Sequence, residues 1–418
     1  MTQRRGFEEK EKKTNYRLRA SNIEVFSRKI HETTVNSKKI FFRDSDNDYF
    51  RRLGKVISQS PTGASCANLM AKFIAGDGVD DTQYPLENSH GLGMNDLITL
   101  ASEDIATYYG VAFFVTYRFD LNNPKNPNKL KPYGQKVINI ADIAVSKSDD
   151  DDNPGIYYLL NRANNGESYR PIDENTRWFY PYNANFDVIM AQMRADCLEK
   201  GIKDPSPEQL LHNYRGQCLY VNLTPRFRYP LPPWDAVYND MDSEARISIY
   251  TNTQARLGFM GRMFVKTHSQ GEEHDEAMAK VIAKSLGVEN SGGITYIPVE
   301  NADDVDKAIK VDQLKPQYDD KLFELTKKSL RENISAMFNR IPDQLIYSSS
   351  GGLFSASGTA YMEMKKFYNE QCLKERFILE NSLTKIYGKK VKINDFASLQ
   401  DVNYSVKIPN NIPNNGQQ

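Results

Sequence analysis

Apolar residues recur at helical spacing in several long stretches of the chain, and strand-like runs lie between them. Leu69, Met70, Phe73 and Ile74 predict a helix that enters at Ser60-Pro61 and stops at Gly76. Further helical patterns cover 94–109 and 186–200, and runs rich in β-branched and aromatic residues predict strands over 110–119, 135–145, 155–161 and 217–223. The first half of the chain therefore predicts a mixed α+β fold.

The second half predicts long helices separated by proline and glycine. Four prolines between 225 and 233 exclude a helix before Trp234, and Asp235 is expected to cap a long helix. A second helix, 318–339, carries the apolar stripe Phe323, Leu330, Ile334 and Met337 beside Lys and Arg residues. It ends at Ile341-Pro342, and a Ser/Gly-rich loop over 343–358 leads to a last long helix, 359–387.

Three remaining segments have weaker patterns. Residues 1–20 are charged and almost free of aliphatic side chains, which predicts a mobile arm or one that becomes ordered only on assembly. The segment 266–316 predicts a small α/β insert with a helix over 275–286 and a strand over 293–299. After Gly388 only strand-like pieces remain, at 391–393 and 404–408, in a polar tail.

Charge and cysteine usage narrow the function classes. Lys and Arg number 54, as do Asp and Glu, so the 418-residue chain has a formal charge of zero and a mean hydropathy of −0.62. That balance argues against tight, non-specific binding to the phosphates of nucleic acid, and it is compatible with a neutral conduit for DNA. Four scattered cysteines indicate a reducing compartment, and no apolar run is long enough for a leader or a membrane span.

Candidate catalytic and metal motifs are weak. No GxxxxGK[ST] or GxGxxG surrounds the glycine-rich loop, and Ser355 lacks the GxSxG context of a nucleophile. His268 and His274 are six residues apart, which puts them on different faces of a helix. The acidic run Asp149–Asp152 lacks the glycine and distal glutamate of a calcium loop. The aromatic residues follow apolar patterns without interleaved basic stripes, so we expect no cofactor, no metal and no base-stacking surface.

Two stretches resemble the portal protein family of tailed bacteriophages, in particular its shorter, siphovirus-like form. One is YPLPPWDAVYNDMDSEARISIYTNTQARLGFMGRMFV, and the other is GGITYIPV followed by DDKLFELTKKSLRENISAMFNRIPDQLI. The resemblance covers about 47–387. It implies an α+β portal fold with a wing, long stem helices, a small clip and a short or absent crown.

By this resemblance the chain divides into eight segments. They are an N-terminal arm (1–46), the first, β-rich part of the wing (47–234), stem helix 1 (235–265), a clip (266–316), stem helix 2 (317–340), a tunnel loop (341–358), a long wing helix (359–388) and a short tail or crown remnant (389–418).

The resemblance also implies three groups of functional residues. The DNA-facing tunnel loop would contain Ser348, Ser349, Ser350, Gly351, Gly352, Leu353, Phe354 and Ser355. The docking surface of the clip would contain His268, Glu272, Glu273, Glu289, Asn290 and Tyr296. The subunit interface of the stem would contain Phe323, Lys327, Leu330, Arg331 and Ile334.

The implied function is a homododecameric ring at one capsid vertex of the virion, assembled in the host cytoplasm. Double-stranded DNA would pass through its channel during genome packaging and ejection. Partners would be the large terminase, a head-completion or adaptor protein and the major capsid protein, with no membrane. A portal of this kind is not an enzyme. Two alternatives are another virion assembly or connector protein and a metal-dependent hydrolase using Asp149–Asp152.

Overall fold

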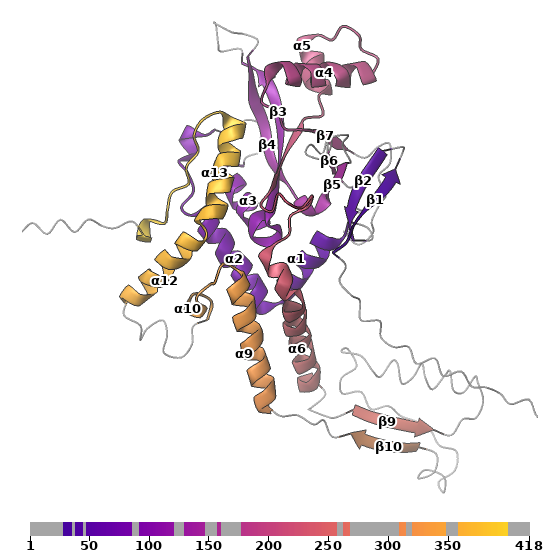
Figure 1. Cartoon of the computed structure of the whole chain (residues 1–418), viewed down its shortest axis with the longest axis vertical. Coiled ribbons are helices and arrows are strands. Elements are labelled where there is room, and N and C mark those ends of the chain that lie inside the picture. The colour runs from indigo at the N-terminus through magenta and orange to yellow at the C-terminus, as the bar shows by residue number, and fades with distance from the viewer. Residues whose placement is uncertain are drawn as a thin grey trace, which may run out of the picture.

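The structure is a computed structural model, and the part that it describes is well over half of the chain. The described residues are 28–35, 38–44, 47–85, 92–120, 129–146, 157–159, 177–256, 262–267, 309–314, 320–347 and 358–399. They form a mixed α+β body from which two helices project toward a separate pair of strands (Figure 1).

Three helices, α1 (Tyr49–Gln59), α2 (Pro61–Ala75) and α3 (Met94–Tyr108), form the centre of the body. The expected entry at Ser60-Pro61 is confirmed, because the Ser60 hydroxyl accepts a hydrogen bond from the Gly63 amide at 2.9 Å. Gly76 ends α2 with a positive φ of 52°. The break between α1 and α2 thus places the N-terminus of α2 in the middle of the body, where Ser60 and Thr62 are buried.

An eight-stranded sheet packs beside these helices in the order β1-β2-β5-β6-β7-β8-β3-β4. All neighbours are antiparallel except β7 and β8. The strands are β1 (Ile30–Val35), β2 (Lys38–Arg43), β3 (Gly110–Phe119), β4 (Leu130–Ile138), β5 (Ile143–Ser146), β6 (Tyr157–Leu159), β7 (Trp178–Pro181) and β8 (Gln217–Asn222).

Two strand predictions need correction. The expected arm 1–46 contains the β1–β2 hairpin, whose residues Ile40 and Phe42 are buried in the core. The single strand expected over 135–145 is two strands, because a 3-10 turn at Ile140–Asp142 separates β4 from β5. Asn139 starts this turn by accepting a hydrogen bond from the Ala141 amide at 2.9 Å.

Two helices after β7, α4 (Phe186–Glu199) and α5 (Pro207–Asn213), lie at the end of the body opposite the projecting helices (Figure 1). Asp196 on α4 is fully buried and accepts hydrogen bonds from the Tyr180 hydroxyl and the Arg215 backbone amide at 2.8 and 2.9 Å. The Arg215 guanidinium pairs with the same carboxylate at 2.7 Å. A buried carboxylate is tolerated here because each oxygen has donors.

The second half begins with a 3-10 turn, η3 (Pro233–Val237), which continues into α6 (Tyr238–Arg256). Asp235 does not cap this helix, contrary to expectation. Its carboxylate instead accepts hydrogen bonds from the Tyr49 hydroxyl at 2.8 Å and from Arg28 at 2.5 Å. The helix is also shorter than 235–265, since β9 (Arg262–Thr267) already pairs with β10 (Ile309–Leu314).

The chain returns along α9 (Asp320–Met337), and Asn339 and Arg340 then adopt left-handed backbone conformations that end the helix before Pro342. A short helix, α10 (Asp343–Ile346), follows. The single long helix expected over 359–387 is α12 (Gly358–Gln371) and α13 (Leu373–Tyr387), with the break at Cys372. Val391 and Ile393 are buried but do not form the expected strand.

Trp234 joins the two halves of the chain at the centre of the core. It is fully buried, and its ring stacks on Phe338 at 4.6 Å between centroids and 9° between planes. Its indole N–H donates to the carbonyl of Thr107 at 2.9 Å, and the edge of Tyr109 meets it at 5.5 Å. The entry into α6 and the end of α9 are therefore held together by aromatic packing.

We predict that Trp234→Ala lowers the free energy of unfolding by about 3–5 kcal/mol, since it removes a fully buried indole. Trp234→Phe should lower it by less, because it mainly leaves the carbonyl of Thr107 without its donor. Denaturant unfolding measures both. Phe377→Ala is the control, because that ring is 61% exposed. Equal losses from Trp234→Ala and Phe377→Ala would contradict a central role for Trp234.

Candidate functional site

The most distinctive feature of the molecule is the helix pair, defined here as α6 and α9. The two helices contact each other and run in opposite directions between the body and the β9–β10 strands (Figure 1). Among the described side chains, Ala245 is the last buried one along α6, and Leu330 is the first buried one along α9. At 1.5 Å per residue, each helix extends roughly 15 Å past these points. The outer half of the helix pair is therefore largely exposed to solvent.

The inner half of the helix pair is attached to α2. Ile334 is fully buried, and the hydroxyl of its neighbour Ser335 lies 3.9 Å from the Cys66 sulfur on α2. On the α6 side, a Cβ added to Gly63 would lie 3.0 Å from the sulfur of Met241. A glycine in the first turn of α2 thus allows α6 to pack closely against it.

A polar junction at the N-terminus of α2 completes this attachment. We define the junction as Ser60, Thr62, Glu244, Arg331 and Tyr347. The Glu244 carboxylate accepts hydrogen bonds from the Ser60 hydroxyl, from the Thr62 amide at 3.1 Å and from the Thr62 hydroxyl at 2.6 Å. Since backbone N–H groups at a helix N-terminus attract anions, this carboxylate suits its position.

Tyr347 extends the junction to α9 and to the end of α10. Its hydroxyl shares a hydrogen bond with the Thr62 hydroxyl, and the Arg331 guanidinium lies over its ring, 4.9 Å from the centroid. Burial raises the pKa of Tyr347 above its ordinary value, so the hydroxyl stays protonated at neutral pH. Four elements, α2, α6, α9 and α10, therefore meet at one set of side chains.

The predicted stem residues divide between two environments. Leu330 and Ile334 are buried in this chain's own core, so they pack within the subunit. Lys327 is half-buried, and Arg331 is exposed apart from its contact with Tyr347. Phe323 lies in α9, but its side chain is outside the described set.

The other predicted site residues fall outside the described ranges. This applies to the loop residues Ser348–Ser355, to the clip residues His268, Glu272, Glu273, Glu289, Asn290 and Tyr296, and to the acidic run Asp149–Asp152. The base of the expected clip is described, since β9 and β10 pair in antiparallel register from Arg262–Leu314 to Thr267–Ile309.

Metal binding and thiol reactivity depend on how the His, Cys, Asp and Glu side chains of the described residues are grouped and exposed. Among them there is no group of three His, Cys, Asp or Glu side chains placed to hold a metal ion. All four cysteines are buried and free, and burial raises the pKa of Cys66 and of Cys372 to about 12, so these two thiols stay protonated. Burial also raises the pKa of Asp104 to about 8. In the described helices, none is long and apolar enough to cross a bilayer.

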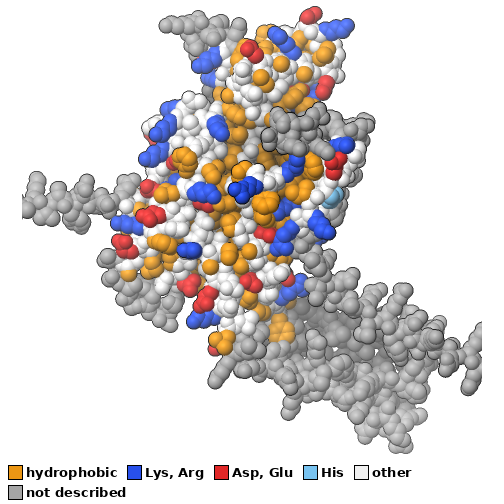
Figure 2. Space-filling model, viewed as in Figure 1, with side chains coloured by type: hydrophobic (Ala, Val, Ile, Leu, Met, Phe, Trp, Pro, Cys, Tyr) orange, Lys and Arg blue, Asp and Glu red, His pale blue; other side chains and the backbone are white. Residues whose placement is uncertain are grey.

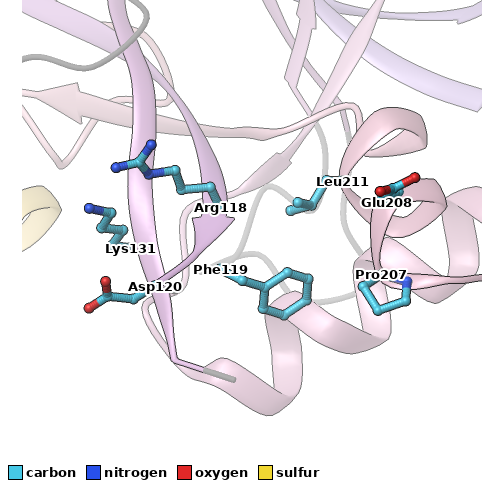
Figure 3. A pocket seen from close by; sticks show the side chains of 7 residues that line it. All are labelled: Arg118, Phe119, Asp120, Lys131, Pro207, Glu208 and Leu211. Carbon is cyan, nitrogen blue, oxygen red and sulfur yellow. The ribbon is translucent and has the colours of Figure 1, made fainter. Parts of the chain in front are cut away.

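One cavity of about 460 Å³ lies between the β3–β4 hairpin and α5. Figure 3 shows Arg118, Asp120 and Lys131 on one side of it, and Phe119 facing α5 on the other. Glu208, Pro207 and Leu211 complete the lining. Carboxylates and cations share this cavity, and its described lining includes no histidine, cysteine, serine or threonine.

Sequence reasoning identified the helix pair but missed the polar junction. Ser60 and Pro61 were read as a helix entry, and the same signal marks the anion-attracting N-terminus to which Glu244 binds. Glu244 and Tyr347 gave no comparable signal, because their partner Thr62 is 182 and 285 residues away in the sequence.

Comparison with known proteins gives matches among solved structures only. No protein-family model and no curated protein matches the chain. The neck of a native gene transfer agent particle, computed with C12 symmetry, is 14% identical over 86% of this chain and 87% of that chain, with a TM-score of 0.40. The virion of the native particle is 14% identical over 82% of each chain, with a TM-score of 0.39.

A third similar structure is an HK97 family phage portal protein from Corynebacterium diphtheriae. It is 11% identical over 79% of this chain and 89% of that chain, with a TM-score of 0.38. At such identities and TM-scores, no residue of this chain takes its role from these proteins.

We predict that Glu244→Gln lowers the free energy of unfolding by about 1–3 kcal/mol, since the amide cannot accept all three hydrogen bonds. Glu332→Gln is the control, because that carboxylate is exposed and its ion pair with the exposed Lys328, at 3.8 Å, contributes little to stability. Denaturant unfolding should show a change within about 0.5 kcal/mol for the control. Equal stability of the two variants would contradict a structural role for the junction.

Proposed function

We propose that the chain is a portal subunit: copies of it form a ring at one vertex of a phage-like capsid, and DNA passes through the central channel. The observation that carries this proposal is the helix pair, which leaves the body, is exposed over its outer half and ends at paired strands. The sequence resemblance of the Tyr229–Val265 and Asp319–Ile346 segments supports it independently.

The exposed outer half of the helix pair supports assembly with other copies. Two helices with little apolar contact between them are marginal in water, so a neighbouring subunit would supply the missing packing. Leu325 is 65% exposed and lies nine residues before Ile334, which places it roughly 180° around α9 from that buried side chain. Leu325 thus replaces Leu330 and Ile334 as the apolar side chain offered to a neighbour.

The surface of the body is compatible with a subunit that contacts other copies of itself and lies beside a DNA channel. Figure 2 shows charged residues of both signs around hydrophobic side chains on one face of the molecule. With a formal charge of zero, the chain would not hold a passing duplex by general phosphate attraction. We assign α6 and α9 to the stem, β9–β10 to the base of the clip, and α12 and α13 to the wing behind the tunnel loop.

The finer parts of the proposal follow from the same assignment. A terminase and later a head-completion protein would dock at the clip, the capsid protein would surround the wing, and the motor's ATP hydrolysis would belong to the terminase. The ring would have twelve subunits. The portal subunit itself would perform no catalysis. The second candidate, another connector or assembly protein of the virion, would also form rings but would not be required for DNA packaging.

We predict that the purified chain forms particles of about 574 kDa, twelve copies of a 47.8 kDa subunit, with an axial hole in negative-stain images. Leu325→Glu should shift the population toward smaller species, because it places a charge in the subunit contact. Leu198→Glu is the matched control, since Leu198 is 62% exposed but lies on α4, away from the helix pair. Native mass measurement distinguishes the variants. If Leu325→Glu leaves the rings unchanged, the outer face of α9 is not part of the subunit interface.

We also predict that shortening the segment 348–357 leaves ring formation intact and impairs DNA packaging or retention, since the deleted residues would face the channel. The measurements are native mass and the amount of nuclease-protected DNA per particle. A connector without a packaging role would show normal protected DNA. Loss of the ring itself would show that this segment belongs to the subunit contact and not to the channel.

A further inference from the structure

Two cations contact the same aromatic ring on the sheet, that of Phe114, far from the helix pair. Lys136 on β4 has its ammonium 5.3 Å from the centroid of Phe114, and the guanidinium carbon of Arg177, just before β7, is 4.8 Å from the same centroid. The two charges are therefore at most about 10 Å apart, the sum of these two distances. Arg177 also lies 4.9 Å from the ring centroid of Phe179.

The aromatic platform beneath these cations is rigid and buried. Phe114 is 8% exposed, Phe179 is fully buried, and their rings meet at 5.2 Å between centroids. Gly216, with a φ of +89°, allows this packing, because a Cβ at that position would collide with the Phe114 ring. Both cations are exposed to solvent, so they present positive charge at the surface above the buried Phe114 ring.

Neither cation has a negative partner among the described residues. No described carboxylate, carbonyl or hydroxyl accepts a hydrogen bond from Lys136 or Arg177. Arg215 and Arg43 also lie over aromatic rings, but the first pairs with Asp196 and the second donates to the carbonyl of Pro230. Burial, and then the charge of Arg177, lower the pKa of Lys136, as expected for two neighbouring cations.

We propose that Lys136 and Arg177 form a binding site for backbone phosphates of double-stranded DNA, away from the helix pair. An anion placed between the two cations would relieve their mutual repulsion and would still leave them in contact with the rings. The site lies on β3, β4 and β7, at the other end of the body from the β9–β10 strands (Figure 1). The choice of DNA over an acidic peptide rests on the proposed function, which brings duplex DNA to this protein.

The cavity between the β3–β4 hairpin and α5 also contains two cations of that hairpin, but carboxylates lie beside them. Arg118 and Lys131 are cross-strand partners further along the same β3–β4 pair, but Asp120 and Glu208 line the cavity with them. Among the described residues, positive charge is therefore opposed by carboxylates at that end of the hairpin and not at Lys136 and Arg177. This confines the proposed contact to the two cations, enough for about two phosphates.

The test is a titration of the full-length protein with a short, mixed-sequence duplex DNA at several salt concentrations. Each phosphate contact contributes about 0.9 to the slope of log K against log salt concentration. Lys136→Gln with Arg177→Gln should reduce that slope by about 1–2 and weaken binding most at low salt. The matched control, Lys365→Gln with Lys389→Gln, also removes two cations that lie over tyrosine rings and should leave the slope unchanged.

A second variant separates charge from packing. Lys136→Arg with Arg177→Lys keeps both charges, so it should keep the wild-type slope even if the cover over Phe114 is altered. Equal slopes for the glutamine pair and the wild type would overturn the proposal, as would equal reductions in the site and control variants. A glutamine pair that loses binding to poly-glutamate but not to DNA would assign the site to an acidic peptide and overturn the proposal for DNA.

The same samples distinguish this inference from the proposed function. Ring formation, measured by native mass, does not depend on Lys136 or Arg177, because both lie on the sheet and not on the helix pair. Rings with an unchanged DNA slope would therefore overturn only the phosphate site. A lack of rings together with a reduced slope in the glutamine pair would retain the site and count against the portal assignment.

Discussion

Two helices that leave a folded body and return to it must be attached firmly at their inner ends, because their outer ends have little to pack against. In this chain the inner ends of both helices contact α2, α6 also contacts α1, and α9 also contacts the turn that precedes α6. Trp234 stacks on Phe338 where α6 begins and α9 ends, and Ile334 and Met241 pack beside α2. This apolar contact provides most of the attachment, since burial of large side chains is the main favourable term in folding.

The polar junction gives this apolar contact a fixed geometry. Apolar packing tolerates small rotations of a helix about its axis, whereas the hydrogen bonds of Glu244 to Ser60 and Thr62 do so only over a narrow range of distances. Tyr347 binds to the same threonine, so the direction of the chain as it leaves α10 is fixed together with the helix pair. A ring of identical subunits needs such reproducible geometry, because a small error in helix direction is repeated at every contact.

Local sequence patterns predicted those parts of the fold that depend on local physics. Ser60-Pro61 and Gly76 mark the ends of α2 correctly, because capping and left-handed glycine are local effects. The break at Cys372 and the separation of β4 from β5 are not visible in the periodicity, and the second depends on one short turn in which the Asn139 side chain accepts a hydrogen bond from the Ala141 amide. Leu330 and Ile334 were recognised as one apolar stripe. The sequence could not tell whether that stripe meets this chain or a neighbour, and the structure places both residues in the chain's own core.

The distribution of charge shows that sequence patterns also limit what can be predicted about function. The formal net charge of zero argues against DNA binding as a property of the whole chain. In addition, no single segment of the sequence carries a basic stripe. Lys136 and Arg177 are 41 residues apart in sequence and come together only because β4, β3, β8 and β7 are neighbours in one sheet. A neutral conduit and a local phosphate contact are compatible, because phosphate attraction is screened within about 10 Å at moderate salt. Two cations on the sheet could therefore hold DNA locally without slowing a duplex that moves past the helix pair.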